Sequence, residues 1–239
     1  MGTTRLYYLP AGRTVDRACG TRSLKGTMEP AALWGYPMQL VLTRHGEVEG
    51  IDPPRFRGRA ELPLTNLGRR QAQALGRSLA REFHPRELAA SPMQRCRDTA
   101  DEIARATGVT ARVEPGINDF DYGIWQWKTH DEIERKFPRE FALWMSAPQW
   151  LRFPGGESLE TVALRTADAL REALDHHADD TVVWVAHEGV NRVILLRALD
   201  LPLSAYWRIG QDPCCINVIE IRSDGDVRVK RMNDTAHLR

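Results

Sequence analysis

The clearest indication of the fold is the stretch Thr181-Val182-Val183-Trp184-Val185-Ala186-His187-Glu188-Gly189. Its first part is a short apolar run rich in β-branched residues, which predicts a buried strand. A histidine and a glycine follow directly at the end of this run. The arrangement recurs earlier in the chain, where Gln39-Leu40-Val41-Leu42-Thr43 precedes Arg44-His45-Gly46-Glu47.

Further strands and helices are expected to alternate around these two runs. Strands are predicted over residues 87–90 and 111–114, and a terminal hairpin over 216–221 and 227–229 with its turn at 223–225. Helices are predicted over 65–83 with Thr65 as N-cap, over 91–103 with Ser91 as cap and Pro92 in the first turn, over 158–177, and from 190 through Leu196. The alternation predicts an α/β fold, a three-layer sandwich with a mostly parallel central sheet and helices on both faces.

Two segments depart from this alternation. Residues 116–156 are rich in loops, with short helices expected near 130–137 and 138–146, and are interpreted as a lid inserted over the sheet. Residues 1–37 have neither helical nor strand periodicity. They are interpreted as a poorly ordered extension or as residues that precede a true start at Met38, and these two interpretations are favoured over a targeting peptide. Residues 38–239 are expected to form a single domain.

Composition and charge argue against several classes of protein. The 239 residues include 33 Lys and Arg against 32 Asp and Glu, a net charge of +1, so no nucleic acid is expected as partner. Apolar runs are shorter than the roughly 20 residues of a membrane-spanning helix, so no membrane is expected either. The four cysteines form no Cys-x-x-Cys pair and are interpreted as reduced thiols, which predicts a cytoplasmic protein without a metal site.

Basic and hydrogen-bonding side chains are expected to meet at the carboxyl edge of the sheet. His45 and His187 each follow a strand, Arg44 adjoins His45, and Arg95 lies early in the helix after strand 87–90. Guanidinium groups bind phosphate through paired hydrogen bonds, and helix N-termini add backbone donors, so this cluster suits a phosphate dianion. The alternatives are structural histidines and surface arginines in ion pairs.

Six sequence blocks resemble, in the same order, those of the histidine phosphatase superfamily, which includes the phosphoglycerate-mutase-like proteins. The resemblance extends over about residues 38–222. The blocks are Leu42-Thr43-Arg44-His45-Gly46-Glu47, the segment from Arg55-Phe56-Arg57-Gly58 to Gln71-Ala72, Ser91-Pro92-Met93-Gln94-Arg95 with Thr99-Ala100, Asp119-Phe120-Asp121-Tyr122-Gly123-Ile124-Trp125, Pro154-Gly155-Gly156-Glu157-Ser158 and Val185-Ala186-His187-Glu188-Gly189.

The resemblance implies a reaction and a role for each matched residue. The histidine of the Arg-His-Gly block attacks phosphorus in this family, so residues 38–239 are expected to hydrolyse small phosphomonoesters through a phosphohistidine, without metal or cofactor. The implied roles are nucleophile for His45, proton donor and acceptor for Asp119 with Asp121 as the alternative, phosphate binding for Arg44, Arg95, His187 and Arg55, and substrate contact for Arg57 and Trp125. Core packing is an equally good interpretation of Trp125.

Three positions depart from the family pattern. Ile51 stands where an asparagine that contacts phosphate is usual, and Arg57 is a candidate to replace it. Asp119 stands where glutamate is usual, and Glu188 where glycine is usual. A carboxylate at position 188 either keeps His187 cationic or points into solvent.

Rival functions stay open beside the phosphatase. A phosphoglycerate mutase shares the nucleophile, but residues 124–186 lack the Arg-Arg-Ser block of the mutases. A catalytically inactive module that binds phosphorylated ligands is a second rival, and a metallohydrolase is a third. The expected partner is a small phosphorylated metabolite, and the resemblance makes a homodimer an option.

Overall fold

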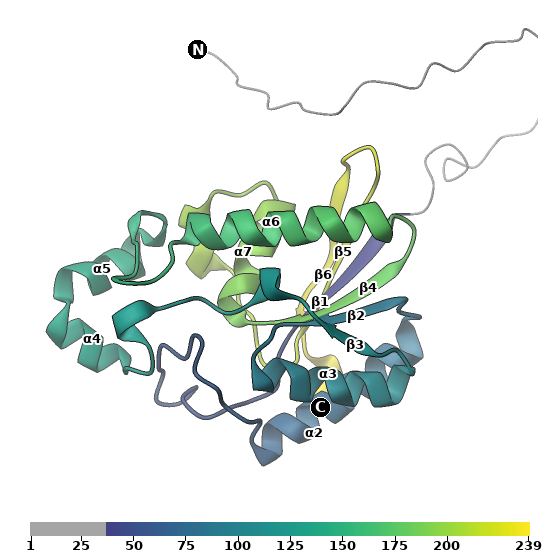
Figure 1. The fold of residues 1–239 in the computed structure, drawn as a ribbon, viewed down its shortest axis with the longest axis horizontal. Helices are drawn as coiled ribbons and strands as arrows, with labels where there is room; N and C mark the ends of the chain where they lie inside the picture. The colour runs from purple at the N-terminus through teal and green to yellow at the C-terminus, as the bar shows by residue number, and fades with distance from the viewer. Residues whose placement is uncertain (1–36) are drawn as a thin grey trace, which may run out of the picture. The chain divides into compact units, whose positions relative to one another are not determined.

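The computed structural model describes residues 37–239, which form one six-stranded sheet with its helices (Figure 1). The strands are β1 (Met38–Arg44), β2 (Glu87–Ala90), β3 (Ala111–Val113), β4 (Thr181–Ala186), β5 (Ile216–Ile221) and β6 (Val227–Asp234), in the spatial order β3-β2-β4-β1-β5-β6. The first four strands of this order are mutually parallel, β5 runs antiparallel to β1, and β6 runs antiparallel to β5. The predicted α/β class with a mostly parallel sheet is confirmed.

Helices cover both faces of this sheet (Figure 1). α2 (Asn66–Glu82) and α3 (Gln94–Thr107) pack together on one face, and α6 (Leu159–His176) and α7 (Glu188–Ala198) lie on the other. α4 (His130–Lys136) and α5 (Pro138–Ser146) lie together away from the sheet. The short 3-10 helices of the described residues are η1 (Pro115–Ile117), η2 (Gly123–Trp125), η3 (Pro148–Trp150), η4 (Leu203–Arg208) and η5 (Ala236–Leu238).

The central strands contribute side chains to two apolar cores. In β1, Leu40 and Leu42 belong to the core under α6 and α7, whereas Val41 belongs to the core under α2 and α3. In β4, Trp184 belongs to the core under α6 and α7, and Val183 belongs to the core under α2 and α3. Because successive side chains of a strand point to opposite faces, a strand that is buried on both faces is apolar throughout. This explains why β1 and β4 are so clear in the sequence.

Strand pairing places the two histidines beside each other. β1 and β4 are in parallel register with Arg44 opposite Ala186, and the N–H of His45 donates to the carbonyl of Ala186 at 3.1 Å. The N–H of Ser91, directly after β2, donates to the carbonyl of Val185 at 3.0 Å. The residues that follow β1, β2 and β4 therefore share one edge of the sheet.

The predicted start of α3 is wrong. α3 begins at Gln94, and its N-cap is Met93, which makes no side-chain capping hydrogen bond. The Ser91 hydroxyl instead lies 2.7 Å from Nε2 of His187. The Ser91 hydroxyl thus makes a tertiary contact at the sheet edge, whereas local sequence preference predicted that it would cap the helix. The predicted cap of α2 is confirmed, because the side chain of Thr65 accepts from the N–H of Gly68.

Some predictions lie beyond what these elements test. The interpretation of residues 1–37 falls, apart from position 37, outside the described residues. The interpretation of residues 116–156 as a lid inserted over the sheet stays a prediction. Among residues 37–239, no helix is long and apolar enough to cross a membrane.

Candidate active site

His45 is a buried, neutral imidazole with one defined tautomer. Nε2 lies 3.2 Å from Nε of Arg95, and Nδ1 lies 2.7 Å from the carbonyl oxygen of Gly46. A guanidinium always donates, so Nε2 accepts from Arg95 and the ring hydrogen resides on Nδ1, which donates to Gly46. Burial, reinforced by the positive charge of Arg95, holds the pKa of His45 well below 6.5. Nε2 of His45 therefore carries a lone pair and no hydrogen, and this lone pair accepts from Arg95.

Arg95 links His45 to Asp119. The guanidinium is fully buried, and its Nη2 donates to Oδ2 of Asp119 at 2.7 Å. Two backbone carbonyls hold it in place, since Nη1 donates to Ala60 at 2.9 Å and Nη2 to Gly58 at 2.6 Å. The predicted pair of His45 and Arg95 is thus in direct contact, with Asp119 as a third member.

His187 lies behind this group. Its ring centroid is 5.3 Å from that of His45, and its Nδ1 is 3.4 Å from Oδ2 of Asp119. Burial, followed by the charge of Arg95, holds the pKa of His187 well below 6.5. This lowered pKa is opposite to the effect expected if Glu188 kept the imidazole of His187 cationic.

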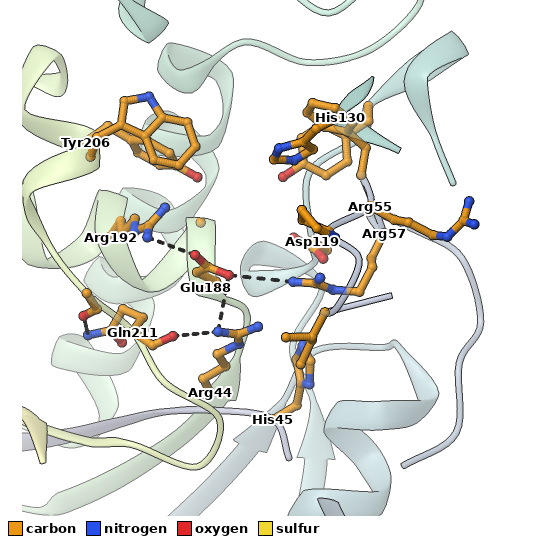
Figure 2. A pocket seen from close by; sticks show the side chains of 18 of the residues that line it. Arg44, His45, Arg55, Arg57, Asp119, His130, Glu188, Arg192, Tyr206 and Gln211 are labelled. Atoms are coloured by element: carbon orange, nitrogen blue, oxygen red, sulfur yellow. Dashed lines mark hydrogen bonds and ion pairs between the residues drawn. The ribbon is translucent and has the colours of Figure 1, made fainter. Parts of the chain in front are cut away.

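Glu188 stands at the centre of three arginines (Figure 2). Its carboxylate lies 3.2 Å from Nη1 of Arg44, 3.6 Å from Nη2 of Arg57 and 2.8 Å from Nη2 of Arg192. Nη1 of Arg44 also donates to the carbonyl of Gln211 at 2.6 Å. Glu188 thus points into the site and aligns three guanidinium groups.

Arg57 lies near Ile51, the position at which the family usually has an asparagine. Both residues line the cavity, and Nη1 of Arg57 donates to the carbonyl of Gly50 at 2.7 Å. Its other terminal nitrogen faces Glu188. A guanidinium therefore stands near the position where the family usually has an amide.

Two predicted site residues have side chains that are directed away from His45. Arg55 lines the cavity, but its guanidinium points away from His45 (Figure 2), donates to the carbonyl of Trp127 at 2.9 Å and lies over the ring of Trp127. Trp125 is fully buried among aromatic side chains, with Phe56 at 5.1 Å between ring centroids, and does not line the cavity. The interpretation that Trp125 packs in the core describes it correctly, because its large apolar surface fills the space under η2.

Asp119 and Asp121 have different surroundings. Asp119 is 7% exposed and lines the cavity. Asp121 is outside the cavity lining, accepts from the N–H of Gly123 at 2.9 Å and pairs with Arg59 at 3.3 Å. Of the two, Asp119 alone lines the cavity above His45.

The cavity above His45 has a volume of about 390 Å³ and an aromatic outer wall. Tyr122, His130, Trp144, Tyr206 and Trp207 form this wall, and none was predicted as a site residue. His130 and Trp144 belong to the inserted segment, so that segment does contribute to the site. Tyr206 and Trp207 come from η4, whose position depends on tertiary packing that leaves no local signal.

Arg192 is the missed residue that the sequence could have revealed. It follows Glu188 by four residues on α7, and oppositely charged residues at this spacing meet on one helix face. Its guanidinium also lies about 5 Å from the ring centroids of Tyr206 and Trp207. Arg192 therefore connects the charged floor of the cavity to its aromatic wall.

The donor set of the site does not resemble a metal centre. Within residues 37–239, no group of three or more His, Cys, Asp or Glu side chains is arranged to hold a metal ion. His45 and His187 direct nitrogens toward Gly46 and Ser91, and the nearest cations are arginines.

A sheet of this topology, with two histidines and several arginines at its carboxyl edge, is typical of one class of proteins. The chain belongs to the histidine phosphatase superfamily (branch 1), whose family model matches residues 40–235. The resemblance carried by the six sequence blocks is confirmed.

Individual relatives share most of their length with this chain. Phosphoserine phosphatase 1 of Hydrogenobacter thermophilus is 34% identical over 201 residues, which cover 84% of this chain and 94% of that protein. The metal-independent phosphoserine phosphatase of Arabidopsis thaliana is 33% identical over 202 residues, covering 84% and 83%. Among solved structures, Bacillus stearothermophilus YhfR superposes with a TM-score of 0.79 at 28% identity, covering 84% of this chain and all of that one.

Proposed function

We propose that this chain is a metal-independent phosphatase that hydrolyses small phosphomonoesters through a phosphohistidine on His45. The observation that carries the proposal is the state of His45, a neutral ring whose Nδ1–H is held by Gly46 while its Nε2 lone pair is directed at the guanidinium of Arg95. Relatives named as phosphoserine and glucosyl-3-phosphoglycerate phosphatases support the enzyme class, a hydrolase of phosphate monoesters.

The first step transfers the phosphoryl group to the enzyme. Nε2 of His45 attacks phosphorus, the bond from phosphorus to the ester oxygen breaks, and a phosphohistidine forms. Asp119 gives a proton to the departing oxygen. Its place beside Arg95, within the cavity, supports this role.

The second step releases inorganic phosphate. Asp119, now a carboxylate, takes a proton from water as the water oxygen attacks phosphorus. The bond from phosphorus to Nε2 of His45 breaks, and the protonated Asp119 is regenerated. The cycle therefore consumes one water and needs no external proton source.

Arginines supply the positive charge that balances the phosphoryl oxygens. The charges of Arg95 and Arg44 both act on His45, and Nε of Arg44 is buried without a hydrogen-bond partner in the described residues. Buried donors are rarely left unpaired, so this N–H is suited to a ligand oxygen. Arg57 adds a third guanidinium, whereas Arg55 points away and is not included in the set.

A small phosphorylated metabolite is the substrate that the cavity favours. A volume of about 390 Å³ between a charged floor and an aromatic wall suits a compact leaving group. The three cysteines of residues 37–239 are free and buried, which supports a cytoplasmic location.

The test is trapping of the intermediate together with turnover. Wild type should release phosphate from p-nitrophenyl phosphate in the presence of chelator, and labelled substrate should leave acid-labile label on the protein. His45→Ala should lose label and reduce turnover by at least about a thousandfold. His176→Ala removes an exposed histidine at the end of α6 and should change neither. Chelator-sensitive turnover, or label retained in His45→Ala, would contradict the proposal.

A further inference from the structure

Arg44 is held at two points by the loop between η4 and β5. The N–H of Cys214 donates to the backbone carbonyl of Arg44 at 3.1 Å, and the backbone carbonyl of Gln211 accepts from Nη1 of the Arg44 guanidinium at 2.6 Å (Figure 2). Nε of the same guanidinium is buried without a hydrogen-bond partner within residues 37–239. The direction of this unpaired N–H therefore depends on where the Gln211 carbonyl lies.

The side chain of Gln211 is used entirely by the protein. It lines the cavity, yet Gln211 is only 3% exposed. Its Nε2 donates to the carbonyl of Gly210 and to Oδ1 of Asn217, both at 2.8 Å. Its Oε1 accepts from Nδ2 of Asn217 at 2.9 Å and from Nδ2 of Asn191 at 3.1 Å. Because a primary amide has two hydrogens and two lone pairs, none is left for a ligand.

Backbone groups fix the direction of the hydrogen bonds between Gln211 and Asn217. The N–H of Asn233 donates to Oδ1 of Asn217 at 2.8 Å, which identifies that atom as the amide oxygen. The carbonyl of Leu42 accepts from Nδ2 of Asn217 at 2.9 Å. The amide of Gln211 must then face Asn217 with its nitrogen toward Oδ1 and its oxygen toward Nδ2.

Asn217 anchors Gln211 in the centre of the sheet. It lies on β5 directly opposite Leu42 of β1 and is fully buried. Burial of an amide is costly unless its polar atoms are paired, and Asn217 and Gln211 pair with each other. Asn191 adds a contact from α7. The sheet and α7 together therefore hold the loop residue that contacts Arg44.

Glu188 is the second acceptor for Nη1 of Arg44. Its Oε2 lies 3.2 Å from that nitrogen, its side chain is 31% exposed, and its Oε1 lies 2.8 Å from Nη2 of Arg192. A partly exposed carboxylate that is shared among guanidinium groups can move with them, whereas the Gln211 carbonyl belongs to a buried network. The Gln211 carbonyl is therefore the more rigid of the two acceptors.

We infer that Gln211 is a positioning residue for Arg44: its buried amide, paired with Asn217, fixes the backbone carbonyl that turns Nε of Arg44 toward the phosphoryl group. The inference rests on the proposed function, because that function places phosphoryl oxygens at Arg44. Gln211 acts only through the Arg44 guanidinium. Its hydrogen bonds should therefore affect phosphate binding only while Arg44 is present.

A double-mutant cycle on phosphate binding tests this dependence. Gln211→Met keeps the length of the side chain and removes its hydrogen bonds, so the Kd of inorganic phosphate, measured by titration calorimetry, should rise at least about tenfold. Arg44→Ala should raise the Kd at least as much. In the Arg44→Ala protein, Gln211→Met should change the Kd by less than about twofold. Unchanged binding in Gln211→Met, or equal losses in both backgrounds, would overturn the inference.

The motion of the Arg44 guanidinium can be measured without a ligand. Nitrogen-15 spectra of labelled arginine, assigned with Arg44→Ala, should show separate signals for Nη1 and Nη2 of Arg44 in wild type. In Gln211→Met, rotation about the bond from Nε to Cζ should be at least about tenfold faster. Equal rates in the two proteins would overturn the inference, whether or not the protein forms a phosphohistidine. Absence of phosphohistidine would instead reject the proposed function, so the two failures are distinguishable.

Two further variants separate positioning from loss of structure. Gln39→Met makes the same substitution on β1, at the other end of the strand from Arg44, and should leave phosphate binding and guanidinium motion unchanged. Asn191→Ala removes one donor to Gln211 and should raise the Kd about threefold, again only while Arg44 is present. If Gln211→Met does not fold, the same cycle with Asn191→Ala decides the question, and equal losses in both backgrounds would overturn the inference.

Discussion

Two carboxylates only two positions apart in the chain, those of Asp119 and Asp121, have different surroundings. Asp119 is in contact with Arg95 beside the nucleophile, whereas Asp121 caps the turn at Gly123 and pairs with Arg59. Sequence alone left both as candidates for the acid, because the direction of a side chain within a loop depends on tertiary contacts. The cavity lining, which includes Asp119 and not Asp121, favours Asp119 as the acid of the proposed reaction.

Replacement of the two aspartates should therefore have unequal effects. Asp119→Asn keeps the shape and removes the proton, so kcat for an alkyl phosphate should fall by roughly a hundred- to ten-thousandfold. Asp121→Asn should change kcat by less than about threefold. Steady-state kinetics at pH 6 on both variants measure the difference, and a larger loss in Asp121→Asn would reassign the acid.

Glu188 offers a second test among single residues. Its carboxylate lowers the positive potential of the three arginines around it. Glu188→Gln removes the negative charge with little change of volume, so inorganic phosphate should inhibit about three- to tenfold more strongly. Competitive inhibition against p-nitrophenyl phosphate provides the measurement, with exposed Glu160→Gln as control. Weaker inhibition in Glu188→Gln would mean that Glu188 matters mainly for arginine geometry.

Among the elements, α2 is held against the loop after β1 by two glycines. A Cβ on Gly68 would stand 2.1 Å from the carbonyl oxygen of Glu47, and one on Gly46 would stand 2.5 Å from that of Gly68. Neither backbone can yield without moving the residues next to His45. The start of α2 and the position of the nucleophile are therefore coupled.

Gly68→Ala should damage both stability and activity. We expect the free energy of unfolding to fall by about 1–3 kcal/mol, because the added methyl overpacks the junction. The same displacement should lower kcat for p-nitrophenyl phosphate. Urea unfolding and kinetics on the same preparation measure the two effects. Exposed Arg69→Ala, one residue further along α2, should stay within about 0.5 kcal/mol of wild type. Unchanged stability in Gly68→Ala would show that the junction can relax.

Elements that are buried on both faces were the most predictable. β1 and β4 carry unbroken apolar runs because each supplies two cores. The start of α3 was not predictable, since the Ser91 hydroxyl contacts His187 across 96 positions of sequence. The aromatic wall was not predictable either, because η4 is positioned at the cavity by tertiary packing, including that against Trp144.

For the whole molecule, two buried neutral histidines make stability depend on pH. The pKa values of His45 and His187 lie well below the value of 6.5 that we assign to the unfolded chain. Below pH 6.5 the unfolded state binds protons that the native state does not, so stability is present above that pH and falls as the solution is acidified. Each histidine contributes a slope of about 1.4 kcal/mol per pH unit.

Urea unfolding at pH 7.5, 6.5 and 5.5 measures this slope. Wild type should lose stability between pH 6.5 and 5.5, and His45→Gln should lose less by about 1 kcal/mol over that interval. His176→Gln, at an exposed position, should keep the slope of wild type. An unchanged slope in His45→Gln would show that His45 is protonated in the native state.

The contacts of Arg95 also determine how binding free energy is divided. In the resting protein this one guanidinium donates both to Nε2 of His45 and to Oδ2 of Asp119, so neither group is free to react with a stray electrophile. A phosphoryl group must replace both contacts before it is attacked. Part of the binding free energy of the phosphoryl group is used to break these two contacts. This part raises kcat and does not lower the dissociation constant. Ligands without a phosphoryl group should therefore leave the hydrogen bond from Arg95 to His45 in place, however well they pack against the aromatic wall.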